Sequence, residues 1–420
     1  MCRYTIRKSV LLVCLSLMAY YAIMEYYYQN LIIPNFPRFG FHLDLNPEKY
    51  LETKFLFIII LLTSVITSRK SQFIYSIVVF FIIFFLVPSL ITYSFSDQIP
   101  QPTYSIVILL MALCIVASNE IKIPLLKRSK LSFGLVMLLI LISLIPILIQ
   151  FGFYLNVDNL LLRNVYDTRE IFDQNSNSAI NYLFNWLIKA IVPVALIYFL
   201  IHKRYWLAII SFITLLYLYA ISGSKIIFIT SFVMVFFFIA GRDFVDKTKV
   251  ASIMLVVGLL AIYLLDYFVG SHLIGLFIMR MLFLPAYLNY FYFDFFNGEP
   301  LYFAESHFFN MFNSYPFDRP IGFIIAENYI HVDDMNANNG IIGDGYMNLG
   351  YCGVGLNIVI VTAIFLFFNS IKPDPRYLGI FCVLIFLFLS APMLSMFITG
   401  GLWFLFLMGI TIMPEKRSIP

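Results

Sequence analysis

The chain has 420 residues, of which 61% are hydrophobic and only 12% are charged. A soluble domain carries about 25% charged residues, so this composition excludes an ordinary water-soluble protein and indicates a membrane protein. The formal net charge of +4 does not suggest a nucleic-acid partner, because cations placed on one face of a membrane account for it. The five cysteines are scattered and indicate neither a disulfide framework nor a zinc site.

Apolar segments suited to membrane helices follow one another along the chain. A helix needs about 20 apolar residues to cross a bilayer. The first run, after Arg3, Arg7 and Lys8, is predicted to be a signal anchor that is retained. Twelve spans are predicted: 9–28, 54–68, 72–93, 103–118, 131–153, 182–201, 205–221, 225–240, 250–269, 341–369, 377–397 and 400–413. The predicted fold class is an all-α polytopic membrane protein with about 12 transmembrane helices.

Lysine and arginine indicate the orientation of these spans, because they concentrate in cytoplasmic loops. With the N-terminus in the cytoplasm, most of the 27 Lys and Arg fall on the inner side, in tight turns such as 69–70 and 127–130. Both termini are therefore predicted to be cytoplasmic.

Residues 272–296 do not fit the simple alternation. They are largely apolar, but Arg280 lies in their middle, and a central arginine costs about 2.5–3.5 kcal/mol on the insertion scale. The segment is predicted to be an external interfacial or re-entrant helix at the membrane surface. The alternative, in which it spans, would move every later loop to the opposite side.

The loops on the predicted outer side are the larger ones. They cover residues 29–53, 155–181 and 270–340, whereas the inner loops are short basic turns. The chain is predicted to be a single integral membrane domain, residues 1–420, with these outer loops forming the working face.

The second outer loop carries Arg163 and Arg169 on either side of Tyr166. Arginine suits a phosphate, because its planar fork donates two parallel hydrogen bonds and keeps its charge. The alternative is local: Arg163 pairs with Asp167 at i,i+4 and Arg169 is simply solvated.

Two further cations lie near the predicted outer surface. Lys225 ends the tight turn SGSK at 222–225 and Arg280 lies within 272–296, so both are candidate ligands for an external anion. The alternative for Lys225 is that it extends to the lipid headgroups. Lys189, inside the sixth span, is costly there unless it lines a cavity.

The third outer loop supplies candidate catalytic residues. His331 is a candidate general base because its ordinary pKa is near neutrality, and Glu327 is an alternative. Arg319 is the arginine of the same loop. A lone loop histidine is, on the other hand, often just solvated. The adjacent acids Asp333 and Asp334 are a weak metal signal, and no metal site is predicted.

Polar and glycine residues crowd the end of this loop, in the run NANNGIIGDGYMNLGYCGVG, residues 336–355. Asp344 within it is a further candidate base. The last glycines, Gly350, Gly353 and Gly355, fall at the start of an apolar helix, where small residues let helices pack closely. Helix packing is therefore predicted for them.

The many apolar spans, the unequal outer loops with arginines, the SGSK turn and the NANNGIIGDGYMNLGYCGVG run resemble the bacterial oligosaccharide repeat-unit polymerases, the Wzy family of O-antigen and capsule polymerases. The resemblance covers most of the chain as a topology and is specific as sequence only in patches. It implies a GT-C-like glycosyltransferase in the bacterial plasma (inner) membrane. Such enzymes take a glycan from undecaprenyl pyrophosphate and transfer it to a new lipid-linked repeat unit.

The resemblance also assigns roles. The arginines Arg163, Arg169, Arg280 and Arg319 would stabilise the pyrophosphate leaving group, with Lys225 and Tyr166 at the same substrate. His331 or Glu327 would take the proton from the acceptor sugar. The implied partners are the lipid-linked oligosaccharide, the bilayer and a chain-length regulator membrane protein. No cofactor is implied, and the chain has no nucleotide-binding GxGxxG motif.

Three alternatives remain at this stage. An O-antigen ligase has the same topology and lipid donor but transfers to lipid A–core. A polysaccharide flippase or other transporter predicts two related halves and short loops on both faces. A non-enzymatic scaffold for glycan assembly predicts that the arginines and His331 are dispensable.

Overall fold

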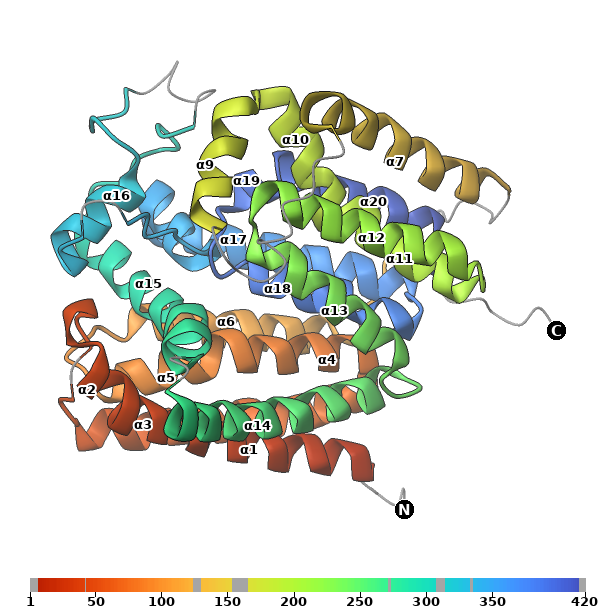
Figure 1. The fold of residues 1–420 in the computed structure, drawn as a ribbon. Coiled ribbons are helices and arrows are strands. Elements are labelled where there is room, and N and C mark those ends of the chain that lie inside the picture. Colours follow the sequence, from red (N-terminus) through yellow and green to blue (C-terminus); the bar gives the residue numbers. More distant parts are fainter. Residues whose placement is uncertain are drawn as a thin grey trace. The chain divides into compact units, whose positions relative to one another are not determined.

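The computed structural model describes residues 7–41, 43–123, 130–152, 165–270, 273–306, 314–332 and 335–414. The described residues form helices joined by turns and loops, with no β-strand among them beyond one isolated β-bridge between Pro373 and Pro414, which confirms the predicted all-α class. Figure 1 shows these helices along the chain. The chain forms two compact units. The prediction of one integral membrane domain stays a prediction.

Unit 1 comprises Met1–Glu120, Phe244–Leu366 and Ile385–Met393. Its elements are α1 (Lys8–Tyr27), η1 (Tyr28–Ile32), α2 (Ile33–Asn35), η2 (Pro37–Phe39), α3 (Pro47–Lys70), α4 (Gln72–Phe81), η3 (Ile82–Leu86), α5 (Val87–Ser94), α6 (Gln101–Val116), α14 (Phe244–Val269), η5 (Ile274–Phe283), α15 (Leu284–Phe295), α16 (Ile321–Ile325), η7 (Ala326–Ile330) and most of α17 (Ile341–Ile371).

Unit 2 comprises Ile121–Asp243, Phe367–Leu384 and Leu394–Pro420. Its elements are α7 (Lys130–Phe151), α9 (Val165–Asn175), α10 (Ser178–Trp186), η4 (Leu187–Ile191), α11 (Val192–Ile201), α12 (Tyr205–Ser222), α13 (Lys225–Ile239), η8 (Pro375–Tyr377), most of α18 (Leu378–Leu387) and of α19 (Met393–Ile398), and α20 (Leu402–Thr411).

Nine helical stretches in the described part of the chain are long and apolar enough to cross a membrane. Eight of them coincide with predicted spans. The ninth is Ile274–Phe295, so length and composition allow this segment to span as well. Predicted spans 103–118 and 225–240 correspond to the shorter helices α6 and α13. The total of 12 spans therefore stays a prediction.

The predicted span 377–397 is wrong as one continuous helix. α18 ends at Leu387, and residues 388–392 form turns before α19 begins at Met393. Pro392 has no backbone N–H and disfavours helical geometry at Ala391, which is a physical reason for the break.

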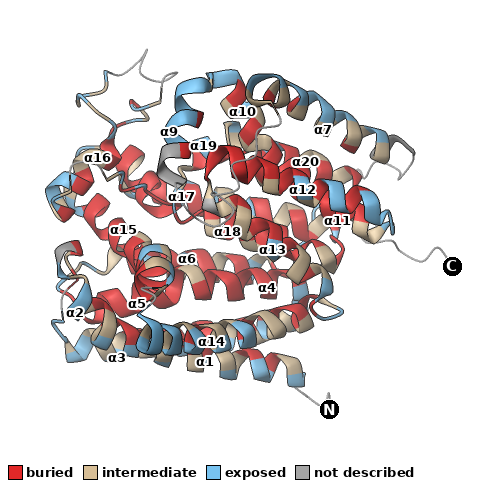
Figure 2. Ribbon diagram, viewed as in Figure 1, coloured by how far each residue is buried: buried red, intermediate tan, exposed pale blue. Residues whose placement is uncertain are grey.

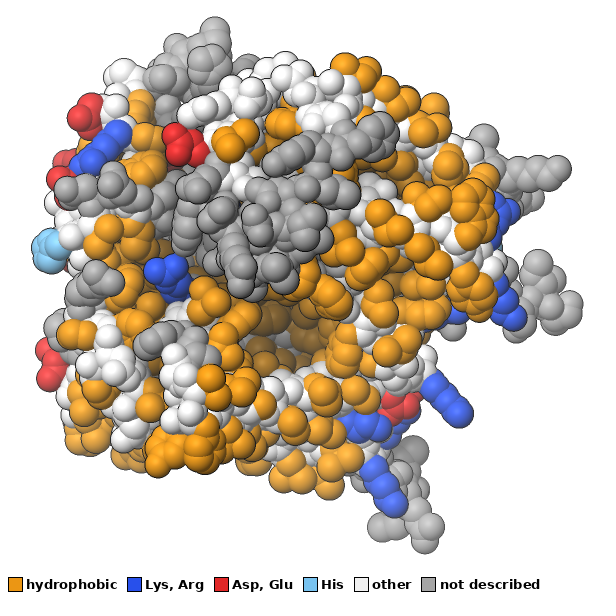
Figure 3. Space-filling model, in the orientation of Figure 1, with side chains coloured by type: hydrophobic (Ala, Val, Ile, Leu, Met, Phe, Trp, Pro, Cys, Tyr) orange, Lys and Arg blue, Asp and Glu red, His pale blue; other side chains and the backbone are white. Residues whose placement is uncertain are grey.

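Burial separates the core of unit 1 from its lipid-facing helices. In the stretch Gln72–Ser94, which joins α4, η3 and α5, 94% of the apolar window is buried, against 11% for α14 (Figure 2). Leu260 and Leu264 of α14 are about half exposed, and hydrophobic side chains cover much of the visible surface (Figure 3). In a bilayer such a surface costs nothing, because lipid chains are as apolar as leucine.

α15 packs into the core of unit 1, and the prediction that residues 272–296 form an interfacial or re-entrant helix stays a prediction. Tyr287, Tyr290 and Tyr292 are each 1% exposed or less. The Tyr290 hydroxyl lies 2.6 Å from the Thr103 Oγ1 and 3.3 Å from the Ser89 Oγ, which ties α15 to α6 and α5. The aromatic side chains thus serve the core and satisfy their hydroxyl groups there.

Wide π-turns precede prolines at four places. η1, η3, η4 and η5 are π-helical, and the α-helix that follows each has proline at its second residue: Pro34, Pro88, Pro193 and Pro285. A proline inside a helix lacks the N–H for the i−4 carbonyl, and its ring clashes with that carbonyl. Widening the turn that contains this carbonyl relieves the clash without ending the helix.

α17 folds back on itself. Its backbone is non-helical at Leu349 and Gly350, where Gly350 has φ +60°. The Asn357 side-chain amide donates to the Ile341 carbonyl at 2.7 Å, although 16 residues of straight helix would separate them by about 24 Å. The short arm before the kink (341–348) therefore lies against the long arm after it (351–371).

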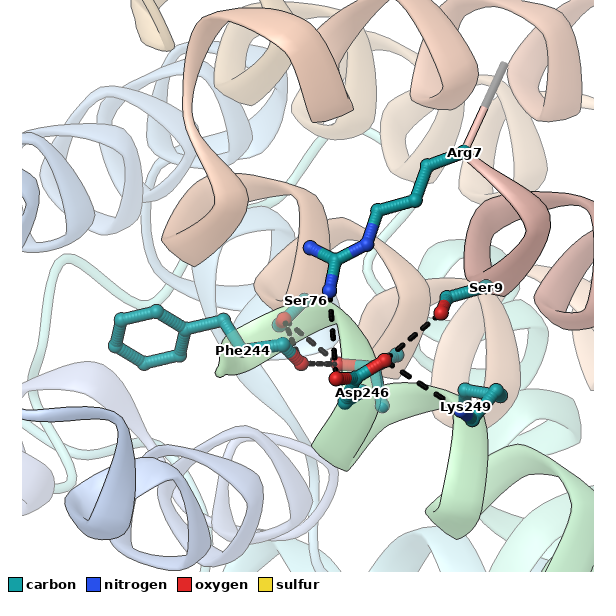
Figure 4. Close-up of polar contacts among 7 residues, drawn as sticks. Arg7, Ser9, Ser76, Phe244, Asp246 and Lys249 are labelled. Carbon is teal, nitrogen blue, oxygen red and sulfur yellow. Dashed lines mark hydrogen bonds and ion pairs between the residues drawn. The ribbon is translucent and has the colours of Figure 1, made fainter. Parts of the chain in front are cut away.

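One acidic side chain fastens α1 to α14 at the end of unit 1 nearest the N-terminus. Asp246 accepts from Ser9 Oγ at 2.8 Å, and Arg7 and Lys249 lie within 3.3 and 3.4 Å of its carboxylate (Figure 4). Basic side chains also gather near this end (Figure 3).

Candidate functional site

Residues 296–306 and 314–332 of unit 1, predicted to lie on the outer side and therefore termed the outer segment, hold three of the predicted site residues. Tyr329 fixes η7 to α15, because its ring stacks on Phe291 at 4.5 Å and its hydroxyl donates to Asp294 at 2.6 Å. Burial and the nearby Asp294 carboxylate both raise the pKa of Tyr329, so the hydroxyl stays a proton donor in this contact.

Two backbone contacts fix α16 in the same way. The Ile321 N–H donates to the Glu305 carboxylate at 3.0 Å, and the Ala337 N–H donates to the Gly322 carbonyl at 3.0 Å. Desolvation raises the pKa of Glu305, and the Ile321 N–H acts in the opposite direction. A side chain on Gly322 would meet Asn336, so glycine permits this close approach.

Arg319 and Glu327, predicted as catalytic, form an ion pair. Their side chains are 36% and 48% exposed. The Tyr315 hydroxyl donates to the Arg319 carbonyl at 3.0 Å. The structure therefore brings a candidate base and a candidate phosphate ligand together, in direct contact with each other.

His331 ends η7 with φ +57°. Non-glycine residues at positive φ are uncommon, and histidine is among those enriched there. The ring is exposed, and no hydrogen bond or ion pair to it is found among the described residues. His331 therefore has a structural role at the end of η7, and its role as a base stays a prediction.

Unit 2 brings together two other predicted binding elements. Arg169 lies on α9, and its Nε donates to the carbonyl of Gly223, in the SGSK turn between α12 and α13, at 3.3 Å. Gly223 ends α12 with φ +60°, a conformation that glycine adopts freely. This hydrogen bond holds the Arg169 guanidinium beside Gly223, two residues before α13 begins. Because Nε is fixed by the bond, the orientation of the two terminal nitrogens is restricted as well.

The remaining predicted residues are placed less fully. Tyr166 lies in α9 and Lys225 begins α13, but their side chains fall outside the described part of the chain, as do all of Arg163 and the alternative pairing of Arg163 with Asp167. Arg280 lies in η5 and is exposed. It forms no ion pair with the other described residues.

A buried polar cluster was not predicted from the sequence. Asp344, treated there as a loop acid, is 3% exposed. One carboxylate oxygen accepts from the Met393 N–H and the other from the Asn348 amide, both at 2.9 Å. Asn348 Oδ1 in turn accepts from the Phe303 N–H at 3.0 Å. The cluster holds the turn before α19 and residues 301–303 against the short arm of α17, so Asp344 is a structural residue here.

The signal for this cluster was present in the sequence. Asn339, Asp344, Asn348 and Asn357 lie in or beside an apolar span, and buried polar groups need partners. Their partners are backbone groups far away in the chain, such as Met393, and no local spacing identifies those.

Comparisons with protein-family models, with curated proteins and with solved structures each found no significant match to this chain. The described helices define it as an all-α polytopic membrane protein.

Proposed function

We propose that the protein polymerises oligosaccharide repeat units carried on undecaprenyl pyrophosphate, to form O-antigen or capsular polysaccharide at the periplasmic or outer face of the plasma membrane. The observation that carries the proposal is the contact of Arg169 with the SGSK turn. Arg169, predicted as a phosphate ligand, thus contacts a turn 54 residues later in the chain, and that turn ends in Lys225, another predicted anion ligand.

Arg169 suits the leaving group of this reaction. As the acceptor hydroxyl attacks the anomeric carbon, the bond from that carbon to the pyrophosphate oxygen breaks and negative charge grows on the departing group. A cation already fixed in place stabilises that charge without reorganising. Because Nε is engaged by Gly223, the terminal nitrogens of Arg169 remain for a bidentate contact with phosphate.

The reaction also needs a base, and two residues of the outer segment of unit 1 have the chemistry for that role. Glu327 is half exposed, and a carboxylate can accept the proton that an acceptor hydroxyl loses on attack. His331, four residues later and exposed, is the second candidate for this proton. Aromatic side chains in the same segment, such as the exposed Tyr302, suit stacking on sugar rings.

The first experiment removes Arg169 in a strain lacking the native gene. We expect Arg169→Ala to lower polymerisation about 100-fold, the scale for one electrostatic contact to a developing charge. Arg169→Lys is expected to restore part of it, since lysine offers the charge without the fork. Arg242→Ala is the matched control, because Arg242 is an exposed arginine of the same unit on the predicted inner side.

The glycan pattern separates the proposal from its rivals. Loss of a polymerase leaves single repeat units on the lipid A–core, loss of a ligase leaves none, and loss of a flippase traps lipid-linked units inside the cell. Long chains at normal abundance from Arg169→Ala, in protein inserted at normal levels, would contradict the assignment of this arginine.

A further inference from the structure

Arg319 is the only lysine or arginine between Arg280 and Lys372. Its neighbours in the outer segment of unit 1 are acidic: Glu299, Glu305 and Asp318 are described there, in addition to Glu327. A phosphate group approaching this segment meets several negative charges, and Arg319 is the one lysine or arginine among the segment's described residues that attracts it.

The positive charge of Arg319 already has a partner. The Arg319 guanidinium is paired with Glu327, so the carboxylate occupies the fork that a phosphate would need. Both side chains are partly exposed, at 36% and 48%. An ion pair in such contact with water is weak, and a ligand with two or more negative charges competes with it effectively.

The backbone around the pair is held, so opening requires only side-chain rotation. The Arg319 carbonyl accepts from Tyr315, and the Ile321 N–H is bonded to Glu305. On the other side, Tyr329 fixes η7 to α15 through Phe291 and Asp294. The two side chains can therefore part while their Cα positions stay in place.

We infer that Glu327 is a built-in competitor for Arg319, and that a phosphate or diphosphate group opens the pair by displacing it. The inference rests on the proposed function for its consequence: a phosphate group that binds Arg319 frees the Glu327 carboxylate, the candidate base, to accept a proton. Until that phosphate binds, the Arg319–Glu327 ion pair keeps the carboxylate occupied. Phosphate binding therefore precedes proton transfer to Glu327.

The test measures binding of inorganic pyrophosphate to the full-length purified protein in nanodiscs of zwitterionic lipid. Glu327→Gln removes the competing charge, and we expect binding to tighten about fivefold, the scale of an exposed ion pair. Arg319→Gln alone should show no gain over wild type, and combined with Glu327→Gln it should abolish the gain. Glu299→Gln is the matched control, because it deletes one exposed negative charge from the same segment and leaves the pair intact.

If Glu327→Gln and Glu299→Gln tighten pyrophosphate binding equally, the inference is overturned. The loss of one negative charge from the segment would then explain both results. No change with Glu327→Gln would overturn it too. A repeat in nanodiscs containing phosphatidylglycerol identifies the source of the phosphate. A gain that persists there supports a diphosphate ligand, and one that disappears supports capture of a bilayer headgroup by the opened pair. This readout needs no polymerisation, so it can fail while the proposed function stands, and the reverse.

Discussion

Replacing Gly353 by alanine should break the fold-back of α17. A Cβ on Gly353 would lie 2.8 Å from the carbonyl carbon of Gly345, and a Cβ on Gly345 would lie 2.7 Å from the Gly353 carbonyl oxygen. Both contacts are with backbone, which cannot rotate away. Overpacking costs about 1–3 kcal/mol, and strain on the Asn357–Ile341 hydrogen bond adds to this. Alanine returns at most about 1 kcal/mol through helix propensity.

Gly355 provides a matched control two residues later. A Cβ there meets nothing within 4 Å, so Gly355→Ala should be neutral or stabilising by up to about 1 kcal/mol. We expect Gly353→Ala to destabilise the protein by about 2 kcal/mol. The assay is reversible unfolding in mixed micelles, with each variant compared with wild type. Equal stability of the two variants would refute the close approach of the two arms.

Three further changes test other contacts by the same unfolding assay. Asp344→Ala leaves the buried Met393 N–H without its acceptor and should cost about 2–3 kcal/mol; a loss below about 0.5 kcal/mol would contradict the structural role. Tyr329→Phe keeps the ring stacking but removes the hydrogen bond to Asp294, for a loss of about 1 kcal/mol. Asp246→Asn should cost about 1 kcal/mol or less, because its ion pairs are partly exposed, and high salt should abolish most of the difference.

The sequence predicted the helices whose length and apolarity are set by the bilayer. It did not predict the features that depend on tertiary contacts within the protein. A bilayer imposes length and apolarity on a span, and both are readable locally, so α1, α12 and α14 lie close to their predicted bounds. The break at Phe388–Pro392 was missed because the surrounding residues stay apolar. The burial of α15 could not be predicted, because its tyrosine-rich composition fits a membrane interface as well as it fits a core.

Some polar residues of the third predicted loop are exposed and others are buried. Spacing in the sequence does not indicate which. Arg319, Glu327 and His331 are at least partly exposed, but the pairing of the first two depends on α16, the helix that lies between them in the chain. Asp344 was taken for a loop acid because the fold-back is invisible in the sequence. Of the three glycines predicted to pack, Gly353 does, Gly350 makes the kink and Gly355 meets nothing.

The π-turns before prolines are positions where these helices can gain or lose one residue. A π-turn accommodates one more residue than an α-turn over the same rise. The helical segments on either side of it therefore keep the same faces toward their neighbours when the number of residues between them differs by one. Deleting one residue within Ile82–Leu86 should therefore leave both arms in register with their neighbours. The same deletion inside α14 would rotate everything beyond it by about 100°. Homologous chains that differ by a single-residue gap within a span would be expected to carry that gap beside one of these prolines.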